Sequence, residues 1–355
     1  MQRCALLEST ASSPILYHLI PNPHFLLTPP HPMVRAFAPG KCILFGEHAV
    51  VYGHPAVAVA IDSGVEVSLT ESDSWTIEGM AFDSWRHPHI SHILYDVFEY
   101  EGPPLKMDIS SGLFSAAGLG SSAALSNAMG AAIHSLMRPG ETLDSVELAR
   151  IGHSAEAKAQ GGRASPTDTA ASALGGCVVV SAEKVEGTQH IFDASLETPE
   201  GKRNWSICKV DLPAEFDASL VLGFTGVGSP TGDMVAGVAK LLAEEPERHA
   251  DMAAIANITQ AGLTALSAGN LRAVGMAMDA CHERLQALQV SSPALDALVE
   301  AARPHSFGAK LTGAGGGGCM VALTDDPQRV SEAIEIAGGR PLISSLGAKG
   351  VRTLD

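Results

Sequence analysis

The sequence is poor in cysteine, and the few cysteines show no pairing pattern. Six occur in 355 residues, and no two of them form a Cys-x-x-Cys pair. This density and spacing fit neither a disulfide scaffold nor a structural zinc site. We therefore expect reduced thiols, which are typical of a cytoplasmic protein. The six are Cys4, Cys42, Cys177, Cys208, Cys281 and Cys319.

Positive charge and long apolar runs are also scarce. Lysine and arginine number 23 against 39 aspartates and glutamates, so the formal net charge is −16. Such a chain repels phosphate backbones and anionic lipid surfaces, so we expect no nucleic acid and no membrane among its partners. No apolar run approaches the roughly 18 residues that a membrane-spanning helix needs. A nucleotide could still bind at a local site of backbone N–H groups, lysines or a metal.

The sequence does contain enough apolar material for a large core. Hydrophobic residues make up 46% and charged residues 17%, which excludes wholesale disorder. The length fits one large or two medium domains. Residues 1–32 differ from the rest because they are rich in proline and show no periodic pattern. They are either a disordered tail or a mis-assigned extension upstream of a natural start at Met33, and both interpretations stay open.

Strand-like and helix-like segments alternate from Val34 onward, which predicts an α+β protein. A polar stretch at 183–204 is either a long loop or a hairpin. Residues 307–323 are predicted to form a strand, a glycine loop and a second strand. The other predicted strands cover 56–61, 65–70, 105–109, 177–182, 219–224 and 350–354. The predicted helices cover 121–137, 143–160, 233–244, 252–268, 271–288, 292–302 and 328–337.

Three glycine-rich segments carry the residues that suggest chemistry. The first, Ala38 to Gly53, places Lys41, Glu47 and His48 within eight residues. A lysine is a compact cation that can meet an anionic or reacting oxygen. The alternative is an ordinary surface lysine.

The second segment is Ala117-Gly118-Leu119-Gly120-Ser121-Ser122-Ala123-Ala124, directly before a predicted buried helix. Glycines let backbone N–H groups converge on a phosphate, and a helix N-terminus adds favourable partial charge. The serines add hydroxyls for a phosphate or Mg²⁺. The segment is neither a Walker A loop nor a dinucleotide fingerprint. A tight turn with a serine N-cap remains the alternative.

The third segment, Lys310 to Cys319, has five glycines in six positions between apolar runs. Glycine is costly in backbone entropy, so such a run indicates close approach of main chain to another group. A flexible loop is the alternative.

Two acidic residues complete the candidate set. Asp168 follows Pro166 in a predicted turn that leads towards a strand, and Glu156 lies on the predicted helix at 143–160. A carboxylate can accept a proton from an attacking hydroxyl or hold Mg²⁺. Without further context, Asp168 could be a turn or cap residue and Glu156 a solvated helix residue.

In this order the three segments resemble the three motifs of the GHMP small-molecule kinases. The first, APGKCILFGEHAVVYGHPAVAVAI, is most similar to that of the members that phosphorylate mevalonate, and ASPTDTAASALGG resembles the catalytic-aspartate segment of their archaeal type. The resemblance implies two α+β domains, 33–215 and 216–355, with the active site in the cleft between them. It implies ATP-dependent phosphorylation of the C5 hydroxyl of (R)-mevalonate, in isoprenoid biosynthesis, with Mg²⁺ as cofactor.

The resemblance also implies a role for individual residues. Asp168 and Lys41 would be catalytic, and Glu47, His48 and Thr231 would contact mevalonate. Ser122 and Glu156 would bind Mg²⁺. The ATP-binding residues would be Ala117, Gly118, Leu119, Gly120, Ser121, Ser122, Ala123, Gly313, Gly315 and Gly316.

One departure and several alternatives remain. Family members often have a proline and, two residues later, a glycine before the second motif, where this chain has Phe114 and Ala116. We expect altered rigidity of the turn and intact chemistry. The substrate could instead be phosphomevalonate, the 3-hydroxyl of mevalonate or a sugar, and a non-catalytic ligand-binding relative is a further alternative. The oligomeric state, a homodimer included, stays open.

Overall fold

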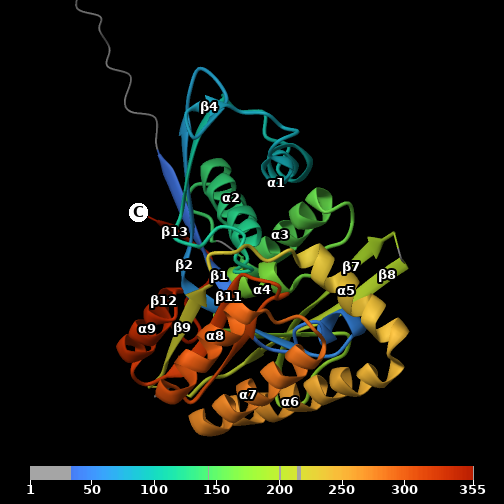
Figure 1. Ribbon diagram of the computed structural model, residues 1–355. Helices are drawn as coiled ribbons and strands as arrows, with labels where there is room; N and C mark the ends of the chain where they lie inside the picture. The colour runs from blue at the N-terminus through green and yellow to red at the C-terminus, as the bar shows by residue number, and fades with distance from the viewer. Residues whose placement is uncertain (1–32, 143, 200, 214–216, 355) are drawn as a thin grey trace, which may run out of the picture. The chain divides into compact units, whose positions relative to one another are not determined.

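Two antiparallel-rich sheets and the helices between and around them make up the computed structural model (Figure 1). The structure describes residues 33–142, 144–199, 201–213 and 217–354. The proline-rich segment 1–32 therefore lies outside the described residues, as does the predicted domain boundary at 215–216. The described mixture of helices and sheets confirms the α+β class.

The first sheet has nine strands within the described residues and is built on two long ones. β2 pairs along its length with β1, at one end with β5 and at the other with β6. The C-terminal strand β13 also joins this sheet, beside β1. Its strands are β1 (Val34–Phe45), β2 (Ala56–Glu71), β3 (Thr76–Ile77), β4 (Met80–Ala81), β5 (Leu105–Ser111), β6 (Cys177–Ser181), β7 (Gln189–Thr198), β8 (Gly201–Val210) and β13 (Arg352–Leu354).

The second sheet is antiparallel, in the order β10-β11-β9-β12. Its strands are β9 (Ser219–Phe224), β10 (Gly308–Thr312), β11 (Cys319–Thr324) and β12 (Arg340–Ser345). The α-helices are α1 (Pro88–Ser91), α2 (Ser121–Met137), α3 (Ser145–Ala159), α4 (Thr167–Leu174), α5 (Thr231–Glu244), α6 (His249–Ser267), α7 (Leu271–Ala287), α8 (Pro293–Ala302) and α9 (Pro327–Ile336). Short 3-10 turns cover 49–52, 246–248 and 303–305, and a π-helical turn covers 92–97.

The first sheet is buried on both faces where its central strands are apolar at successive positions, 56–61 in β2 and 177–180 in β6. Side chains alternate between faces along a strand. Val57 and Val59 therefore belong to one core, which they share with the second sheet and α5 to α9, whereas Ala58 belongs to the other, beneath α2 to α4. Cys177 and Val178 divide between the two cores in the same way. The unbroken apolar runs in β2 and β6 thus explain why helices cover both sides of this sheet.

Most predicted elements are confirmed, usually to within two residues. The two strands predicted at 56–61 and 65–70 are one continuous strand, β2. The stretch at 183–204 is a hairpin, since β7 pairs antiparallel with β8. β1, β3, β4, β12, α1 and α4 were not predicted. The division into domains at 215/216 stays a prediction.

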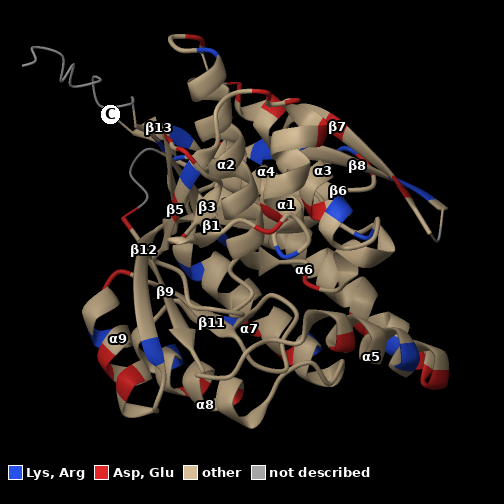
Figure 2. Ribbon diagram, turned by 90° about the horizontal axis from the view of Figure 1, so that it is seen from above, with Lys and Arg blue, Asp and Glu red and all other residues tan. Residues whose placement is uncertain are grey.

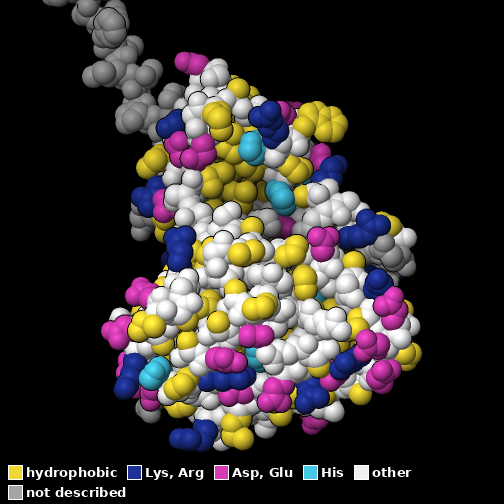
Figure 3. All heavy atoms as spheres, viewed as in Figure 1, with side chains coloured by type: hydrophobic (Ala, Val, Ile, Leu, Met, Phe, Trp, Pro, Cys, Tyr) yellow, Lys and Arg dark blue, Asp and Glu magenta, His cyan; other side chains and the backbone are white. Residues whose placement is uncertain are grey.

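Charged and apolar side chains are distributed unevenly over the surface. Acidic and basic residues are interspersed along the helices and loops (Figure 2). One face has an apolar hollow, in the part where Figure 1 draws α2 between β4 and α1 (Figure 3). Within the described part of the chain, no helix has both the length and the hydrophobicity to cross a membrane.

A buried histidine ties α7 to the second sheet. The backbone N–H of Leu311 in β10 donates to His282 Nδ1 at 3.3 Å, and His282 Nε2 lies 3.2 Å from the carboxylate of Asp296. The ring must be neutral to accept at Nδ1 while Nε2 keeps its proton. Burial, followed by the charges of Lys310 and Arg303, lowers the pKa of His282 to about 4.

This histidine gives a pH dependence of stability with a defined sign. Between about pH 4 and its ordinary pKa of 6.5, the unfolded chain binds a proton that the folded protein does not. The free energy of unfolding therefore falls as the pH drops through this window, by at most about 1.4 kcal/mol per pH unit. His282→Gln keeps an acceptor for Leu311 but cannot titrate, so it should flatten this slope in denaturant titrations between pH 4 and 7. The exposed-site variant His249→Gln should keep the wild-type slope. An unchanged slope in His282→Gln would contradict the assignment.

Candidate active site

The lysine of the first glycine segment lies inside the molecule, not on its surface. Lys41 is in β1, next to an irregularity in the β1–β2 register, and is 3% exposed. Its ammonium donates to the carbonyl of Gly118 at 2.9 Å and lies 3.2 Å from Asp168 Oδ1. Its backbone N–H donates to the carbonyl of Leu119 at 2.9 Å. The surface interpretation of Lys41 is therefore wrong, and β1, the second glycine segment and Asp168 meet at this residue.

Asp168 lies in the first turn of α4 and not in a turn that leads to a strand. The proline at position 166 precedes this helix, as is common at helix starts. The side chain of Asp168 is 40% exposed although its partner Lys41 is almost completely buried. The carboxylate can therefore meet the ammonium on one side and a ligand on the other.

The second glycine segment leads into α2 through left-handed backbone. Gly118 and Gly120 have φ of 75° and 74°, and α2 begins at Ser121 with Gly120 as its N-cap. No side chain caps this helix among the described residues, so the serine N-cap interpretation is wrong. The first backbone N–H groups of a helix lack intrahelical partners, which suits an anion at this end. Ser122 is exposed beside them.

Side chains of this segment also fix it to the core. Ala117, Leu119 and Ala123 are buried. Their backbone is therefore the part that can face a ligand, while their side chains hold the loop in place.

The third glycine segment joins β10 to β11 and packs against the second. A Cβ atom on Gly318 would lie 2.9 Å from the carbonyl oxygen of Ala117, and one on Gly313 would lie 3.6 Å from that of Gly118. Gly315 and Gly316 have φ of 84° and 71°, which side chains rarely adopt. Close packing and left-handed backbone thus explain the glycines better than a flexible loop does.

Thr231 is the first residue of α5 and is exposed. The residues just before it pack on the third glycine segment, since Ser229 Oγ donates to the carbonyl of Gly315 at 2.7 Å. Ser229 also donates its N–H to the carbonyl of Ala116 at 2.8 Å. The start of α5 therefore lies beside both glycine segments.

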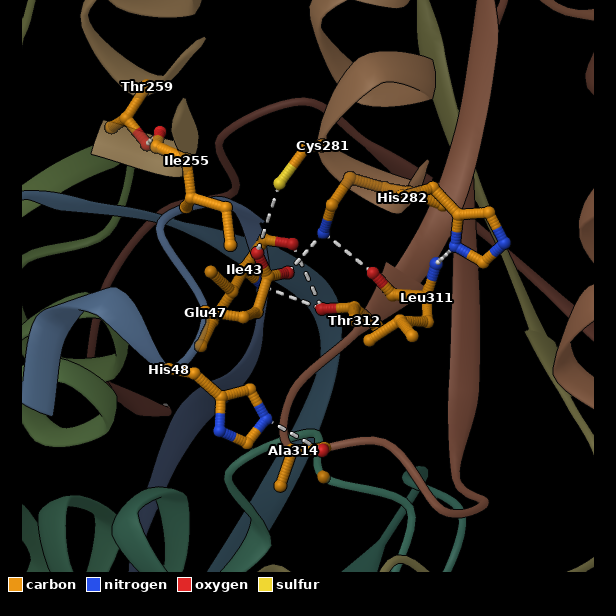
Figure 4. Close-up of polar contacts among 12 residues, drawn as sticks. Ile43, Glu47, His48, Ile255, Thr259, Cys281, His282, Leu311, Thr312 and Ala314 are labelled. Carbon is orange, nitrogen blue, oxygen red and sulfur yellow. Dashed lines mark hydrogen bonds and ion pairs between the residues drawn. The ribbon is translucent and has the colours of Figure 1, made fainter. Parts of the chain in front are cut away.

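Glu47 and His48 contact the second sheet (Figure 4). Glu47 is 1% exposed and forms an ion pair with Lys310 of β10, which is completely buried. Burial raises the pKa of Glu47 above its ordinary value. His48 Nε2 lies 2.9 Å from the carbonyl of Ala314, so this nitrogen donates. Burial lowers the pKa of His48, which favours a neutral ring with Nδ1 as acceptor.

Lys310 is the first residue of the third glycine segment, but its pairing with Glu47 was not predicted from the sequence. A charged residue inside an apolar strand pattern was the available signal, because a buried charge requires a counter-charge. The predicted contact of Glu47 with a substrate stays a prediction.

Glu156 on α3 is buried, so its interpretation as a solvated helix residue is wrong. Oε2 accepts a hydrogen bond from Gln160 at 2.5 Å. Oε1 lies 3.2 Å from His89 Nε2, but the two atoms are not aligned for a hydrogen bond, and in the described structure both lack such a partner. A buried carboxylate oxygen without a donor is a suitable ligand for a cation. His89 was not predicted from sequence.

The departure before the second segment has a structural counterpart. Ala116 has φ of 52°, so an alanine occupies left-handed backbone where relatives often have glycine. The ring of Phe114 stacks on Phe224, with centroids 5.0 Å apart and planes at 13°, and Arg340 lies 5.0 Å over its face. Contacts of its ring therefore restrain Phe114, at the position where a proline would restrain the backbone directly.

The structure thus brings Lys41 and Asp168 together with the second and third glycine segments and the start of α5. Glu47 and His48 contact the β10 side of the third segment. Glu156 lies beside His89 and Gln160. Within the described ranges there is no cluster of three or more histidine, cysteine or acidic residues that could hold a metal by themselves.

Two family models match the chain. The model for the GHMP kinases N terminal domain matches residues 89–176, which include the second glycine segment and Asp168. The model for the GHMP kinases C terminal matches residues 263–340, which include the third segment.

Similar proteins extend the match over most of the chain. The chain is 33% identical to a mevalonate kinase of Pyrococcus furiosus, over 90% of this chain and 98% of that protein. A solved mevalonate kinase superposes with a TM-score of 0.71 at 25% identity and covers 90% of this chain and 100% of its own. The mevalonate kinase of L. major, solved in complex with R-mevalonate, has the same TM-score at 23% identity, covers 87% of this chain and 95% of its own, and supports the fold alone.

Two substitutions, one in the second segment and one at the residue just before it, should have opposite effects. A Cβ on Gly120 would lie 3.1 Å from Lys41 Cγ and 3.5 Å from Asp168 Oδ2, at a φ of 74°. Gly120→Ala should therefore lower the free energy of unfolding by about 1 kcal/mol or more and displace the Lys41–Asp168 pair. Ala116→Gly removes a left-handed alanine and should raise stability by about 0.5–1 kcal/mol. Chemical denaturation measures both. Equal stability of Gly120→Ala and wild type would contradict the described loop geometry.

Proposed function

Because the chain belongs to the mevalonate kinases of the GHMP kinase family, we propose that it transfers the γ-phosphoryl group of ATP to the C5 hydroxyl of (R)-mevalonate. The products are ADP and 5-phosphomevalonate. The observation that carries the assignment of the reacting centre is the Lys41–Asp168 pair, held at 3.2 Å against the carbonyl of Gly118. It places a cation and a carboxylate beside a loop suited to phosphate.

Phosphoryl transfer depends mainly on positioning and on neutralising charge that develops on the transferred group. Lys41 supplies a buried positive charge, which acts more strongly than one in water because the local dielectric is low. Asp168 is partly exposed and accepts the proton of the C5 hydroxyl or orients that hydroxyl towards the γ-phosphate. Lys41 also fixes the carboxylate of Asp168 in the orientation that this requires.

The second glycine segment would hold the triphosphate. Backbone N–H groups at the start of α2 face an anion favourably, and residues 117–123 are fixed to the core by buried side chains. Gly313, Gly315 and Gly316 would support this loop from behind. The apolar hollow near α2 has the character needed for the flat base of a nucleotide (Figure 3).

Ser122 and Glu156 would hold Mg²⁺. The exposed hydroxyl of Ser122 and the buried Oε1 of Glu156, which accepts no hydrogen bond in the described structure, are both oxygen ligands of the kind that Mg²⁺ prefers. When bound, the ion neutralises phosphate oxygens. His48 and Thr231 would contact mevalonate; His48 could accept a hydroxyl proton at Nδ1, because Nε2 donates to Ala314. The described cysteines are all free and buried, which supports a reducing compartment such as the cytoplasm.

A substrate panel tests the proposed reaction. ADP release should be fast with ATP and mevalonate and should stay at background with phosphomevalonate, galactose and homoserine. Faster ADP release with phosphomevalonate or galactose than with mevalonate would assign the chain to another branch of the family. No turnover with any of them would favour a non-catalytic ligand-binding relative.

Asp168→Asn tests the chemical step. The variant keeps the size of the side chain but removes its charge, so kcat should fall by about 10² to 10⁴ while KM changes little. ATP affinity should stay near wild type because the glycine segments and Lys41 remain. Single-turnover phosphorylation and equilibrium ATP binding, measured in parallel, separate the two effects. Near-normal turnover would reduce Asp168 to a structural helix residue.

Two variants test the metal site. Ser122→Ala removes an oxygen ligand and Glu156→Gln removes the negative charge of another, so each should raise the Mg²⁺ concentration needed for half-maximal rate and lower kcat. Binding of Mn²⁺ in the presence of ADP, followed by electron paramagnetic resonance, gives a readout independent of turnover. Asp144→Asn, at the exposed cap of α3, is a matched control that should leave Mn²⁺ binding unchanged. Wild-type Mn²⁺ affinity in both site variants would remove these residues from the metal site.

A further inference from the structure

Three contacts fasten the end of β1 and the residues after it to one face of β10 and its following loop (Figure 4). Glu47 pairs with Lys310. Thr312 Oγ1 accepts from the N–H of Ile43 at 2.8 Å and donates to the carbonyl of the same residue at 3.0 Å. His48 Nε2 donates to the carbonyl of Ala314 at 2.9 Å. Lys310 and Thr312 are alternate residues of β10, so their side chains face the same way, whereas Ala314 contributes a main-chain carbonyl from the loop that follows.

The backbone between these contacts is strained. His48 has φ of 61° and ψ of −42°, a sparsely populated positive-φ conformation that costs a residue other than glycine on the order of 1–3 kcal/mol. Such a conformation persists only where surrounding structure imposes it. Glu47, the residue immediately before it, is fixed to β10 by the ion pair, and His48 itself is fixed by Ala314. The orientation of the imidazole therefore depends on where Glu47 is held.

Stability alone does not explain this ion pair. Both side chains are buried to within 1%, and the desolvation cost of two buried charges can exceed their mutual attraction. Apolar replacements of similar volume are often neutral or stabilising at such sites, whereas removal of one partner leaves an unpaired buried charge. The Lys310 ammonium also donates to the carbonyl of Leu311, and the Cys281 thiol lies 3.9 Å from Glu47 Oε2. The pair is thus completely enclosed by protein.

We propose that Glu47 and Lys310 are positioning residues, which set the strained backbone of His48 and so present its ring to mevalonate without touching the substrate themselves. The proposal rests on the proposed function, since it takes His48 to contact mevalonate. The motif resemblance implies that Glu47 contacts mevalonate; under this proposal Glu47 instead holds His48, which makes the contact. It also gives Lys310, in the third glycine segment, a role separate from the phosphates.

The test separates positioning from structure with one charge-free double variant. Glu47→Met and Lys310→Met singly leave an unpaired buried charge and should lower stability. The double variant Glu47→Met/Lys310→Met is apolar and of similar volume at this place and should recover most of that stability. Its KM for mevalonate should nevertheless stay raised about tenfold, the size expected when one hydrogen bond is misplaced. Its KM for ATP should stay within about twofold of wild type, because Lys41, Asp168 and the phosphate loop are untouched.

Ser344→Ala is the matched control. Ser344 Oγ accepts from the N–H of Asp62 at 2.9 Å and so links β12 to β2, a second contact between the two sheets that lies away from His48. The variant should lower stability and leave both KM values unchanged. A raised KM for mevalonate in this control would mean that any weakening between the sheets has the same effect, which would overturn the proposal.

The remaining outcomes are also decisive. If the double variant recovers both stability and the wild-type KM for mevalonate, the pair is structural and the proposal is overturned. His48→Ala distinguishes this failure from failure of the proposed site. A raised KM for mevalonate in His48→Ala with a normal KM in the double variant overturns the positioning role alone. An unchanged KM in His48→Ala removes His48 from the substrate site and overturns both.

Discussion

The need to pair buried ammonium groups organises this molecule around its active site. Lys41 and Lys310 are both enclosed by protein, and an unpaired charge there would cost several kcal/mol. Lys41 is paired by Asp168 and a carbonyl of the phosphate loop. Lys310 is paired by Glu47 and a carbonyl of its own strand. Lys41 lies in β1, and its partners lie in α4 and the second glycine segment. Lys310 lies in β10, at the start of the third glycine segment, and its partner Glu47 follows β1. Pairing the two lysines therefore fixes β1, α4, β10 and two glycine segments relative to one another.

Glycine makes this arrangement possible at the points where backbones meet. The second and third segments approach so closely that a Cβ on Gly318 would contact a carbonyl oxygen at 2.9 Å. Strained backbone lies beside the proposed reacting groups, as it often does at active sites. Ala116 and His48 have positive φ without being glycine, one beside the phosphate loop and the other beside the proposed substrate site. Each is held by contacts from a distant part of the chain, through Ser229 and Ala314 respectively.

Local sequence pattern predicted most of the fold, and the motif resemblance supplied the residues of the candidate site. A small, apolar, proline-free run located α2 and a β-branched run located β6, both almost to the residue. Pattern failed where tertiary contacts decide the structure. α4 has only eight residues, most of them small and buried, and it directly follows a proline, so Asp168 was expected in a turn. The Glu47–Lys310 pair joins residues 263 positions apart, and the His89–Glu156 contact joins two helices. No local pattern contains such pairings, because they depend on how the sheets and helices pack.

The central claim is that this chain places phosphate on the C5 oxygen of mevalonate. The most direct measurement is the position of phosphate in the product formed from ATP and mevalonate labelled with ¹³C at C5, observed by ³¹P and ¹³C nuclear magnetic resonance. The account predicts one phosphomonoester whose phosphorus couples to the labelled carbon, in an amount equal to the ADP released. A phosphate without that coupling would place the reaction at the 3-hydroxyl or the carboxylate and contradict the account. Release of ADP without any phosphorylated product would contradict it as well.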